Sequence, residues 1–323
     1  MARADLLLAL VQSGSAGDDL AFRRAAEALI AEESAKNHDV LASRLDAALS
    51  QSRRASNVSP LARNDELLEL VYEIVPERRL ADLVLTYGTR SSLQEIVDEH
   101  HRRDLLRSHG IEPRHRALLV GPPGGGKTTV AEALAFELTV PLFTVRYEGL
   151  IGSYLGETAS RMDKLFAMVR TRPSVLFFDE FDAVAKERGD THETGEIKRV
   201  VSSLLLQIDK LPSHVVVVAA TNHPELLDRA VWRRMQVRLS LPQPSRDSKI
   251  EWIRAWEERH GFYLGLAART IADRLAGVSF AELEEFAQDV RRTFVLSGVG
   301  ADSGAISKHV LDQWSKRARV NGA

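Results

Sequence analysis

The segment that most constrains this chain is a glycine-rich octapeptide, Gly-Pro-Pro-Gly-Gly-Gly-Lys-Thr, at residues 121–128. Its glycines let the backbone curl so that successive N–H groups point inward at an anion. Lys127 can then reach the β- and γ-phosphates of a nucleotide, and the Thr128 hydroxyl can ligate Mg²⁺. The sequence therefore predicts a phosphate-binding loop for ATP and Mg²⁺, formed by Gly121, Pro122, Pro123, Gly124, Gly125, Gly126, Lys127, Thr128 and Thr129.

The residues on either side of this loop supply the context that such a loop needs. Residues 116–120 form a short apolar run, which predicts a buried strand, and residues 129–138 have helix formers with apolar spacing near 3.6. The N-terminal amides of that helix would add to the phosphate cradle. Further apolar runs alternate with helical segments, which predicts a doubly wound parallel α/β sheet with additional strands at 142–147, 174–179, 214–220 and 236–241.

The rest of the chain divides into units by composition and periodicity. Residues 1–50 show helical spacing and predict a small helical module, and residues 51–64 are rich in Ser, Arg and Asn and predict a linker. Residues 65–242 form the α/β unit, in which we expect helices at 65–75 and 91–107 and a strand at 83–85. Residues 243–323 predict an α-helical lid, with helices at 247–259, 266–275, 280–296 and 306–318.

Composition limits the classes of protein to consider. The net charge of −2 argues against nucleic-acid binding through bulk charge. The chain has no cysteine, which fits a reducing compartment, and no apolar run has the length of a membrane span. The apolar N-terminus carries an early Asp5, and its apolar residues continue at helical spacing. We therefore interpret it as a core helix rather than a signal peptide. We expect a cytoplasmic protein.

Two later strands end in polar residues that suit phosphate chemistry. The apolar run 175–178 is followed by Asp179 and Glu180. Asp179 would help to hold Mg²⁺ through its water shell, and Glu180 would polarise the water that attacks the γ-phosphate. An Asp-Glu pair after a strand is usually a solvated loop, but its place about fifty residues after a phosphate loop favours the catalytic interpretation. Asn222, after another apolar strand, can orient the attacking water or contact the γ-phosphate.

Taken together, these motifs resemble the AAA ATPases in the narrow sense of that name, the classic clade within the AAA+ group. The resemblance covers residues 83 to 297, and four segments carry it: G-P-P-G-G-G-K-T, F-F-D-E-F-D, A-A-T-N-H-P and L-D-R-A-V-W-R-R. It implies a hexameric ring with nucleotide between neighbouring subunits. It also implies that Arg233 and Arg234 are arginine fingers, which join Lys127, Glu180 and Asn222 in catalysis. The finger spacing is similar to that of katanin and spastin, although a surface pair of arginines remains the alternative.

The resemblance also assigns residues that would contact substrate and adenine. Tyr154 and Leu155 stand where the family has a pore loop that grips a polypeptide, with a locally packed tyrosine as the alternative. Ala281 and Gly88 stand where the family contacts adenine. Phe280 replaces a glycine of the usual lid motif, so the resemblance does not fix how this segment contacts the adenine base.

The most specific function that these features predict is an ATP-driven motor that remodels or unfolds proteins. An ATP-dependent switch and a DNA-associated loader or regulator are the alternatives. Intact Glu180, Arg233 and Arg234 argue against a switch, and Tyr154 and Leu155 favour a protein substrate over nucleic acid. An adaptor and a separately encoded protease, fed by the motor as an unfoldase, are further candidate partners. Residues 1–50 would recruit substrate or adaptor, or serve as a bundle that stabilises the oligomer.

Overall fold

The computed structural model describes residues 26, 29, 70–150, 155–186, 194–298 and 300–321. The chain divides into two compact units, residues 1–63 and 64–323. In the first unit the described residues are Ala26 and Leu29, which are both helical. The rest of the predicted helical module and the predicted linker lie outside the described residues.

The second unit contains a six-stranded sheet in the order β1-β3-β4-β5-β2-β6. Five neighbouring strands run parallel, and only β1, at one edge, pairs in the antiparallel sense with β3. The strands are β1 (Val71–Ile74), β2 (Arg116–Val120), β3 (Leu142–Val145), β4 (Ser174–Phe178), β5 (Val215–Thr221) and β6 (Val237–Ser240). The predicted doubly wound parallel sheet is therefore confirmed, with an antiparallel edge strand added.

Burial explains why the central strands could be recognised. Every residue of β4 and of β5 is buried, as expected for parallel strands that helices cover on both faces. The edge strand β6 instead alternates buried and exposed residues. The predicted strands at 116–120, 142–147, 174–179, 214–220 and 236–241 are all present, with ends that differ by at most two residues.

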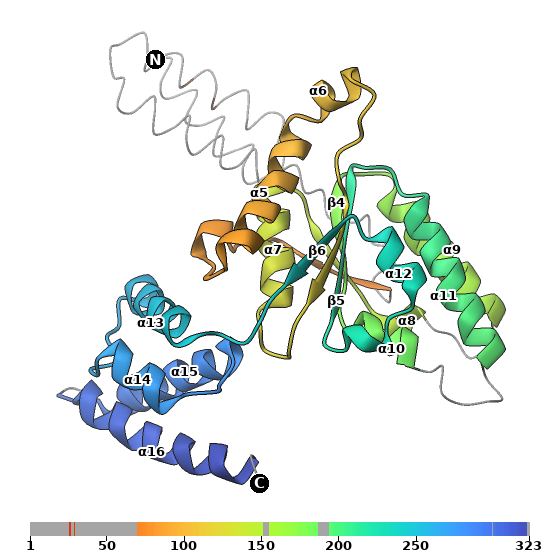
Figure 1. Ribbon diagram of the computed structural model, residues 1–323. Helices are drawn as coiled ribbons and strands as arrows, with labels where there is room; N and C mark the ends of the chain where they lie inside the picture. The colour runs from red at the N-terminus through yellow and green to blue at the C-terminus, as the bar shows by residue number, and fades with distance from the viewer. Residues whose placement is uncertain are drawn as a thin grey trace. The chain divides into compact units, whose positions relative to one another are not determined.

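Helices cover both faces of the sheet (Figure 1). One face carries α5 (Tyr87–His101) and α7 (Lys127–Leu138), and the opposite face carries α9 (Leu155–Val169), α11 (Thr194–Asp209) and α12 (Arg229–Arg234). The shorter connecting helices are η1 (Leu80–Asp82), α6 (Arg103–Ser108), α8 (Tyr147–Leu150), α10 (Phe181–Lys186) and η2 (Pro224–Leu226).

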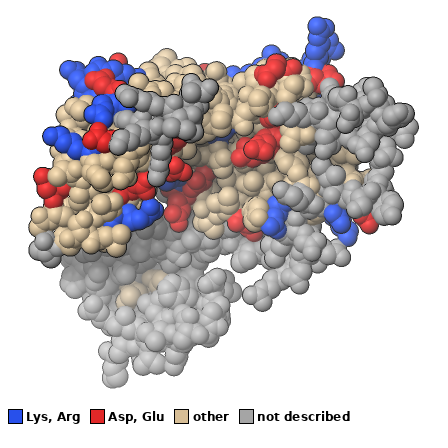
Figure 2. All heavy atoms as spheres, turned by 90° about the horizontal axis from the view of Figure 1, so that it is seen from below, with Lys and Arg blue, Asp and Glu red and all other residues tan. Residues whose placement is uncertain are grey.

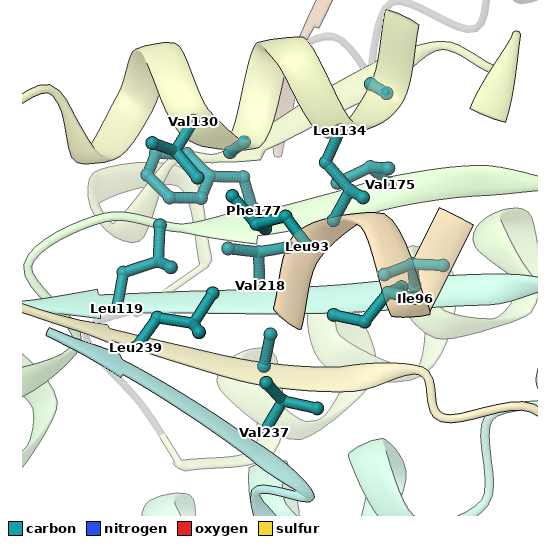
Figure 3. Close-up of a cluster of buried hydrophobic side chains, with 14 of the residues drawn as sticks. Leu93, Ile96, Leu119, Val130, Leu134, Val175, Phe177, Val218, Val237 and Leu239 are labelled. Atoms are coloured by element: carbon teal, nitrogen blue, oxygen red, sulfur yellow. The ribbon is translucent and has the colours of Figure 1, made fainter. Parts of the chain in front are cut away.

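A single apolar cluster joins the sheet to α5 and α7. Leu93 and Ile96 of α5 and Val130 and Leu134 of α7 pack on Phe177 and neighbouring strand residues (Figure 3). The five side chains named here are at most 2% exposed. Burying a large aliphatic or aromatic side chain contributes about 1.5–3 kcal/mol. This cluster therefore fixes where α7 begins, and with it the loop that precedes α7.

The C-terminal part of the chain is helical, as predicted. It consists of α13 (Arg246–His260), α14 (Ala268–Arg274), α15 (Phe280–Ser297) and α16 (Ser303–Asn321). These helices have their own apolar cluster around Trp256, Leu283 and Phe286. The predicted lid is therefore a packed helical bundle in the structure.

Three predicted elements differ from the structure. Residues 71–74, expected within a helix over 65–75, form β1 and pair with 142–145 of β3. Residues 83–85, expected as a strand, form no regular element, and Leu83 and Leu85 pack against the sheet cluster. The predicted helix 91–107 is two helices, α5 and α6, that meet at Arg102.

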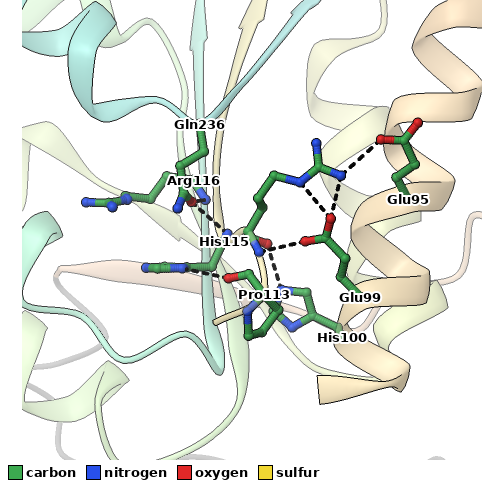
Figure 4. A network of polar contacts seen from close by, with 8 residues as sticks. Glu95, Glu99, His100, Pro113, His115, Arg116 and Gln236 are labelled. Atoms are coloured by element: carbon green, nitrogen blue, oxygen red, sulfur yellow. Dashed lines mark hydrogen bonds and ion pairs between the residues drawn. The ribbon is translucent and has the colours of Figure 1, made fainter. Parts of the chain in front are cut away.

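A polar network at the other end of β2 ties α5 to the sheet (Figure 4). Arg114 pairs with Glu99 and Glu95 of α5, and its carbonyl accepts a 2.9 Å bond from His100 Nε2. The Gln236 side-chain oxygen accepts bonds from the backbone N–H groups of His115 and Arg116, at 2.9 and 3.1 Å. The network lies at the N-terminal end of the strand, away from the loop that follows its C-terminal end.

We expect this network to make stability depend on pH. Burial lowers the pKa of His100 and of His115 below the ordinary value. The unfolded chain therefore binds more protons than the folded one as pH falls below about 6.5, at a cost of at most about 1.4 kcal/mol per pH unit for each histidine. Urea unfolding at pH 7.5 and 5.5 should show lower stability at pH 5.5, with a smaller loss in His100→Gln. Equal losses in the two proteins would contradict this role.

Candidate functional site

A cleft of about 500 Å³ lies at the carboxyl ends of the central strands, between the sheet and the lid helices. The sheet side of the cleft is formed by the phosphate loop and by the residues that follow β4 and β5. Because β4, β5 and β2 are neighbours in a parallel sheet, the segments after them meet at one edge. From this side the cleft is lined by Pro123, Gly124, Gly125, Gly126, Lys127, Thr128, Thr129, Val130, Asp179, Glu180 and Asn222.

Two glycines of the phosphate loop are needed for its shape. A Cβ on Gly121 would lie 2.1 Å from the Leu241 carbonyl oxygen, so only glycine fits between β2 and the end of β6. Gly126 directly precedes α7 and has φ of +83°, a backbone conformation that residues with a side chain rarely adopt. The loop therefore delivers the free amides of the first turn of α7 into the cleft.

Lys127 is held at the floor of the cleft. Its ammonium donates to the carbonyls of Gly121 and Pro122, at 2.8 and 2.9 Å, and to Asn222 Oδ1, at 2.6 Å. Burial lowers the pKa of Lys127, and the nearby charges of Asp179, Asp182 and Glu180 partly offset this effect. The contact with Asn222 connects the phosphate loop directly to the end of β5.

Asp179 lies between the phosphate loop and Glu180. Its Oδ2 accepts a 3.2 Å bond from the Thr128 hydroxyl, and its Oδ1 accepts a 2.9 Å bond from the Glu180 backbone N–H. Glu180 has φ of +46°, which is rare for a residue with a side chain and clusters at functional sites. The strained backbone leaves the Glu180 carboxylate exposed at the cleft.

The lid side of the cleft begins where α15 starts. Ser279 caps α15 in a reciprocal capping box with Glu282, and the Ala281 N–H donates a 3.2 Å bond to the Gly124 carbonyl. A Cβ on Gly124 would lie 2.5 Å from Ser279 Oγ, so the loop and the lid are in close contact. The predicted site residue Ala281 therefore lies at the cleft, beside Phe280 and Glu284.

Sequence reasoning missed part of the wall opposite the phosphate loop. Gly88 does not line the cleft; it is exposed in the first turn of α5. Residues 82–85 line it instead, and Arg259 of α13 donates to the Asp82 carbonyl at 3.3 Å. The remaining lining residues are Arg78, Trp252 and Arg259. No motif marks them, because tertiary packing alone brings them together.

The two predicted finger residues lie outside the cleft, at the C-terminal end of α12. Arg234 Nε forms a 2.7 Å ion pair with Asp209 Oδ2 of α11, and its guanidinium also donates to the Ala230 carbonyl. Arg233 is exposed, and among the described residues the structure records no polar contact for its side chain. Of the two arginines, Arg233 is therefore the one whose guanidinium is accessible for contact with a second molecule.

The predicted pore-loop residues are only partly described. Tyr154 lies outside the described residues, and Leu155 is the first residue of α9. The predicted roles of both residues stay predictions.

Comparison with known proteins agrees with the geometry. Residues 117–243 match the family model "ATPase family associated with various cellular activities (AAA)". An uncharacterized AAA family ATPase of Sinorhizobium fredii is 38% identical over 302 residues, covering 92% of this chain and 90% of that protein. A cell division cycle protein 48 homolog of Archaeoglobus fulgidus is 30% identical over 234 residues, which span 71% of this chain and 31% of the relative.

A proteasome-activating nucleotidase of Pyrococcus horikoshii is 32% identical over 226 residues, covering 64% of this chain and 56% of that protein. The aligned share of the longer relatives is therefore about a third to a half, whereas the Sinorhizobium protein matches over nearly its whole length. That match, together with the phosphate loop and the parallel sheet, shows that the chain belongs to the AAA family and is an ATPase.

Proposed function

We propose that this ATPase is a motor that remodels or unfolds proteins, working as a hexameric ring with ATP hydrolysed between neighbouring subunits. The observation that carries the proposal is that the predicted catalytic residues do not all lie in the cleft of one subunit. Lys127, Glu180 and Asn222 gather in it, whereas Arg233 of α12 is exposed elsewhere. A phosphoryl-transfer site needs positive charge at the transition state, and an arginine from a second subunit can supply it.

Within one subunit the residues have separable tasks. The loop amides and Lys127 bind the β- and γ-phosphates. Asn222 holds Lys127 and faces the cleft, so it is placed to orient the attacking water. The exposed Glu180 carboxylate acts as the general base that takes a proton from that water. Ala281 contributes to the adenine end from the lid.

The donor set at the cleft fits Mg²⁺. The Thr128 hydroxyl and the Asp179 carboxylate already lie 3.2 Å apart, and hydroxyl and carboxylate oxygens are the ligands that Mg²⁺ prefers. Thr128 would coordinate the ion directly, and Asp179 would hold its water shell. The ion, when bound, neutralises charge on the phosphates, while Lys127 and the loop amides keep them in place.

Protein is the favoured substrate class. Among the relatives, the Pyrococcus horikoshii nucleotidase and a 26S proteasome regulatory subunit 8 homolog of Encephalitozoon cuniculi bear names that refer to proteasomes. On the face shown in Figure 2, basic and acidic side chains of the described residues are interspersed, without one continuous basic patch. A nucleic-acid backbone would favour such a patch. No helix in the described part of the chain is long and apolar enough to cross a membrane.

A second candidate is the same motor acting for a separately encoded protease. The proteasome-related names of the relatives favour it. In either case residues 1–50 would recruit the substrate or an adaptor. The proposed domain division is then a linker at 51–64, a nucleotide-binding domain at 65–242 and a lid at 243–323.

A trap experiment tests the substrate class. Glu180→Gln protein, held with ATP, should retain its bound partner, because the site binds nucleotide but does not turn it over. Affinity purification followed by mass spectrometry should recover protein partners, and a protease among them would support the second candidate. Recovery of DNA without any protein partner would contradict the proposal.

A further inference from the structure

Asp182, in the first turn of α10, is a buried carboxylate that the roles proposed above leave unused. It is 4% exposed, and it is the one acidic residue that is buried in the described part of the chain. Burying a carboxylate costs free energy unless a partner compensates for it. The Thr221 hydroxyl, itself 0% exposed, donates a 2.8 Å bond to Asp182 Oδ1. Because both partners are shielded from water, this bond is stronger than a surface contact of the same length.

The bond joins the ends of two neighbouring strands at the point where their backbone pairing stops. The register of β4 and β5 runs to the pair Phe178 and Ala219, whereas β5 continues two residues further, to Thr221. Beyond Phe178 a turn leads into α10. The Asp182 side chain reaches back from α10 to Thr221. A side-chain bond therefore continues the connection that backbone pairing makes up to Phe178.

On the β4 side, the bond holds the turn that contains Glu180. Asp182 follows Glu180 by two positions, and the Glu180 carbonyl accepts a 2.7 Å bond from the Ala183 N–H. Glu180 and Asp182 therefore belong to the same turn. Glu180 has φ of +46°, and such a backbone conformation persists only where the surrounding structure holds it. The bond to Thr221 is one of the contacts that do so.

On the β5 side, the bond holds the residue that directly precedes Asn222. The Thr221 hydroxyl donates to Asp182 and also accepts a 3.0 Å bond from the His223 N–H, so its position is fixed from two directions. These two bonds involve the residues on either side of Asn222. Asn222 Oδ1 in turn accepts the 2.6 Å bond from Lys127. A displacement of the Thr221 hydroxyl would therefore change the orientation of Asn222 in the cleft.

We infer that Asp182 and Thr221 are positioning residues for ATP hydrolysis: their buried bond fixes Glu180, at the end of β4, relative to Asn222, at the end of β5. The inference rests on the roles proposed for Glu180 and Asn222, which both concern the attacking water. A misplacement of about 1 Å can cost about a hundredfold in rate, so the relative position of these two groups controls turnover. Neither positioning residue lines the cleft, so nucleotide affinity does not depend on the bond.

Thr221→Val tests the inference, because it replaces the hydroxyl by a methyl group of similar size. Turnover, measured by steady-state phosphate release, should fall at least about tenfold, the equivalent of one hydrogen bond to a charged group. KM for ATP should stay within about threefold of wild type. Thr221→Ser keeps the hydroxyl and should retain turnover within about threefold. If Thr221→Val does not fold, Thr221→Ala removes the same hydroxyl without the risk of overpacking.

A control variant separates loss of positioning from loss of stability. Thr221→Val should also lower the melting temperature, because it leaves the buried Asp182 carboxylate without this bond. Ser307→Ala likewise removes a buried hydroxyl, one that donates to the Leu264 carbonyl within the helical lid. Its melting temperature should fall as well, but its turnover should stay within about twofold of wild type.

The double variant Thr221→Val/Glu180→Gln shows whether the bond acts through the base. Once the base is removed, its position no longer matters, so adding Thr221→Val should lower the residual turnover of Glu180→Gln by less than about threefold. A further loss of the full tenfold would overturn the inference. Normal turnover in Thr221→Val would also overturn it, and so would equal losses in Thr221→Val and Thr221→Ser.

Glu180→Gln alone distinguishes a failure of this inference from a failure of the proposed function. Normal turnover in Glu180→Gln would refute the proposed site itself. A slow Glu180→Gln beside a normal Thr221→Val would refute only the positioning role of Asp182 and Thr221.

Discussion

Glu180→Gln should lower ATP turnover by about a hundredfold or more, the usual loss when a general base is removed. ATP affinity should stay within about threefold of wild type, because in the proposed site the loop and Lys127 hold the phosphates, and the substitution leaves both intact. Gln has nearly the same shape as Glu, so the strained backbone at φ of +46° should be kept. Steady-state phosphate release and nucleotide binding by calorimetry measure the two quantities.

A matched control distinguishes loss of the base from loss of a negative charge. Glu225 lies three residues after Asn222, is exposed and does not line the cleft. Glu225→Gln should therefore keep turnover close to the wild-type value. Normal turnover in Glu180→Gln would refute the assigned base, and equal losses in the two variants would show a non-specific charge effect.

Arg233→Ala should lower turnover by about a thousandfold, the lower end of the range for removing an arginine finger. Arg233 is exposed and outside its own cleft, so in the proposed ring the loss would arise at the site of a neighbouring subunit. The fold should be unaffected, because no recorded contact among the described residues depends on this side chain. Arg234→Ala should instead lower the melting temperature, since Arg234 is paired with Asp209.

Mixing variants separates a finger that acts in trans from one that acts in its own site. Arg233→Ala subunits keep Glu180, and Glu180→Gln subunits keep Arg233. A mixed ring therefore contains some sites with both residues, and its turnover should exceed that of either variant alone. If the turnover of the mixture never exceeds the summed turnover of the two variants assayed separately, a site shared between subunits is contradicted.

The central strands and the phosphate-loop half of the site could be predicted from the sequence for a physical reason. β4 and β5 are buried along their whole length, so each appears in the sequence as a continuous apolar run. The polar residues that end them, Asp179 and Asn222, then mark the edge of the sheet. Parallel pairing brings those ends to the phosphate loop.

The rest depends on contacts between distant parts of the chain. β1 is four residues long and gains its conformation by pairing with β3, about seventy residues later, so a helix over 65–75 looked equally acceptable. The contact between Arg259 and Asp82 spans 177 positions, which no local pattern reports.

The most direct test of the proposed motor is ATP-dependent unfolding of a protein recovered with the Glu180→Gln trap. The loss of native fluorescence of that protein should be followed with wild type and with Tyr154→Ala. We predict that wild type unfolds it only in the presence of hydrolysable ATP, and that Tyr154→Ala hydrolyses ATP at a comparable rate but unfolds it at least about tenfold more slowly, since a flat aromatic side chain would supply the grip on an extended chain. Equal unfolding by the two proteins, or unfolding that needs no ATP, would contradict the account.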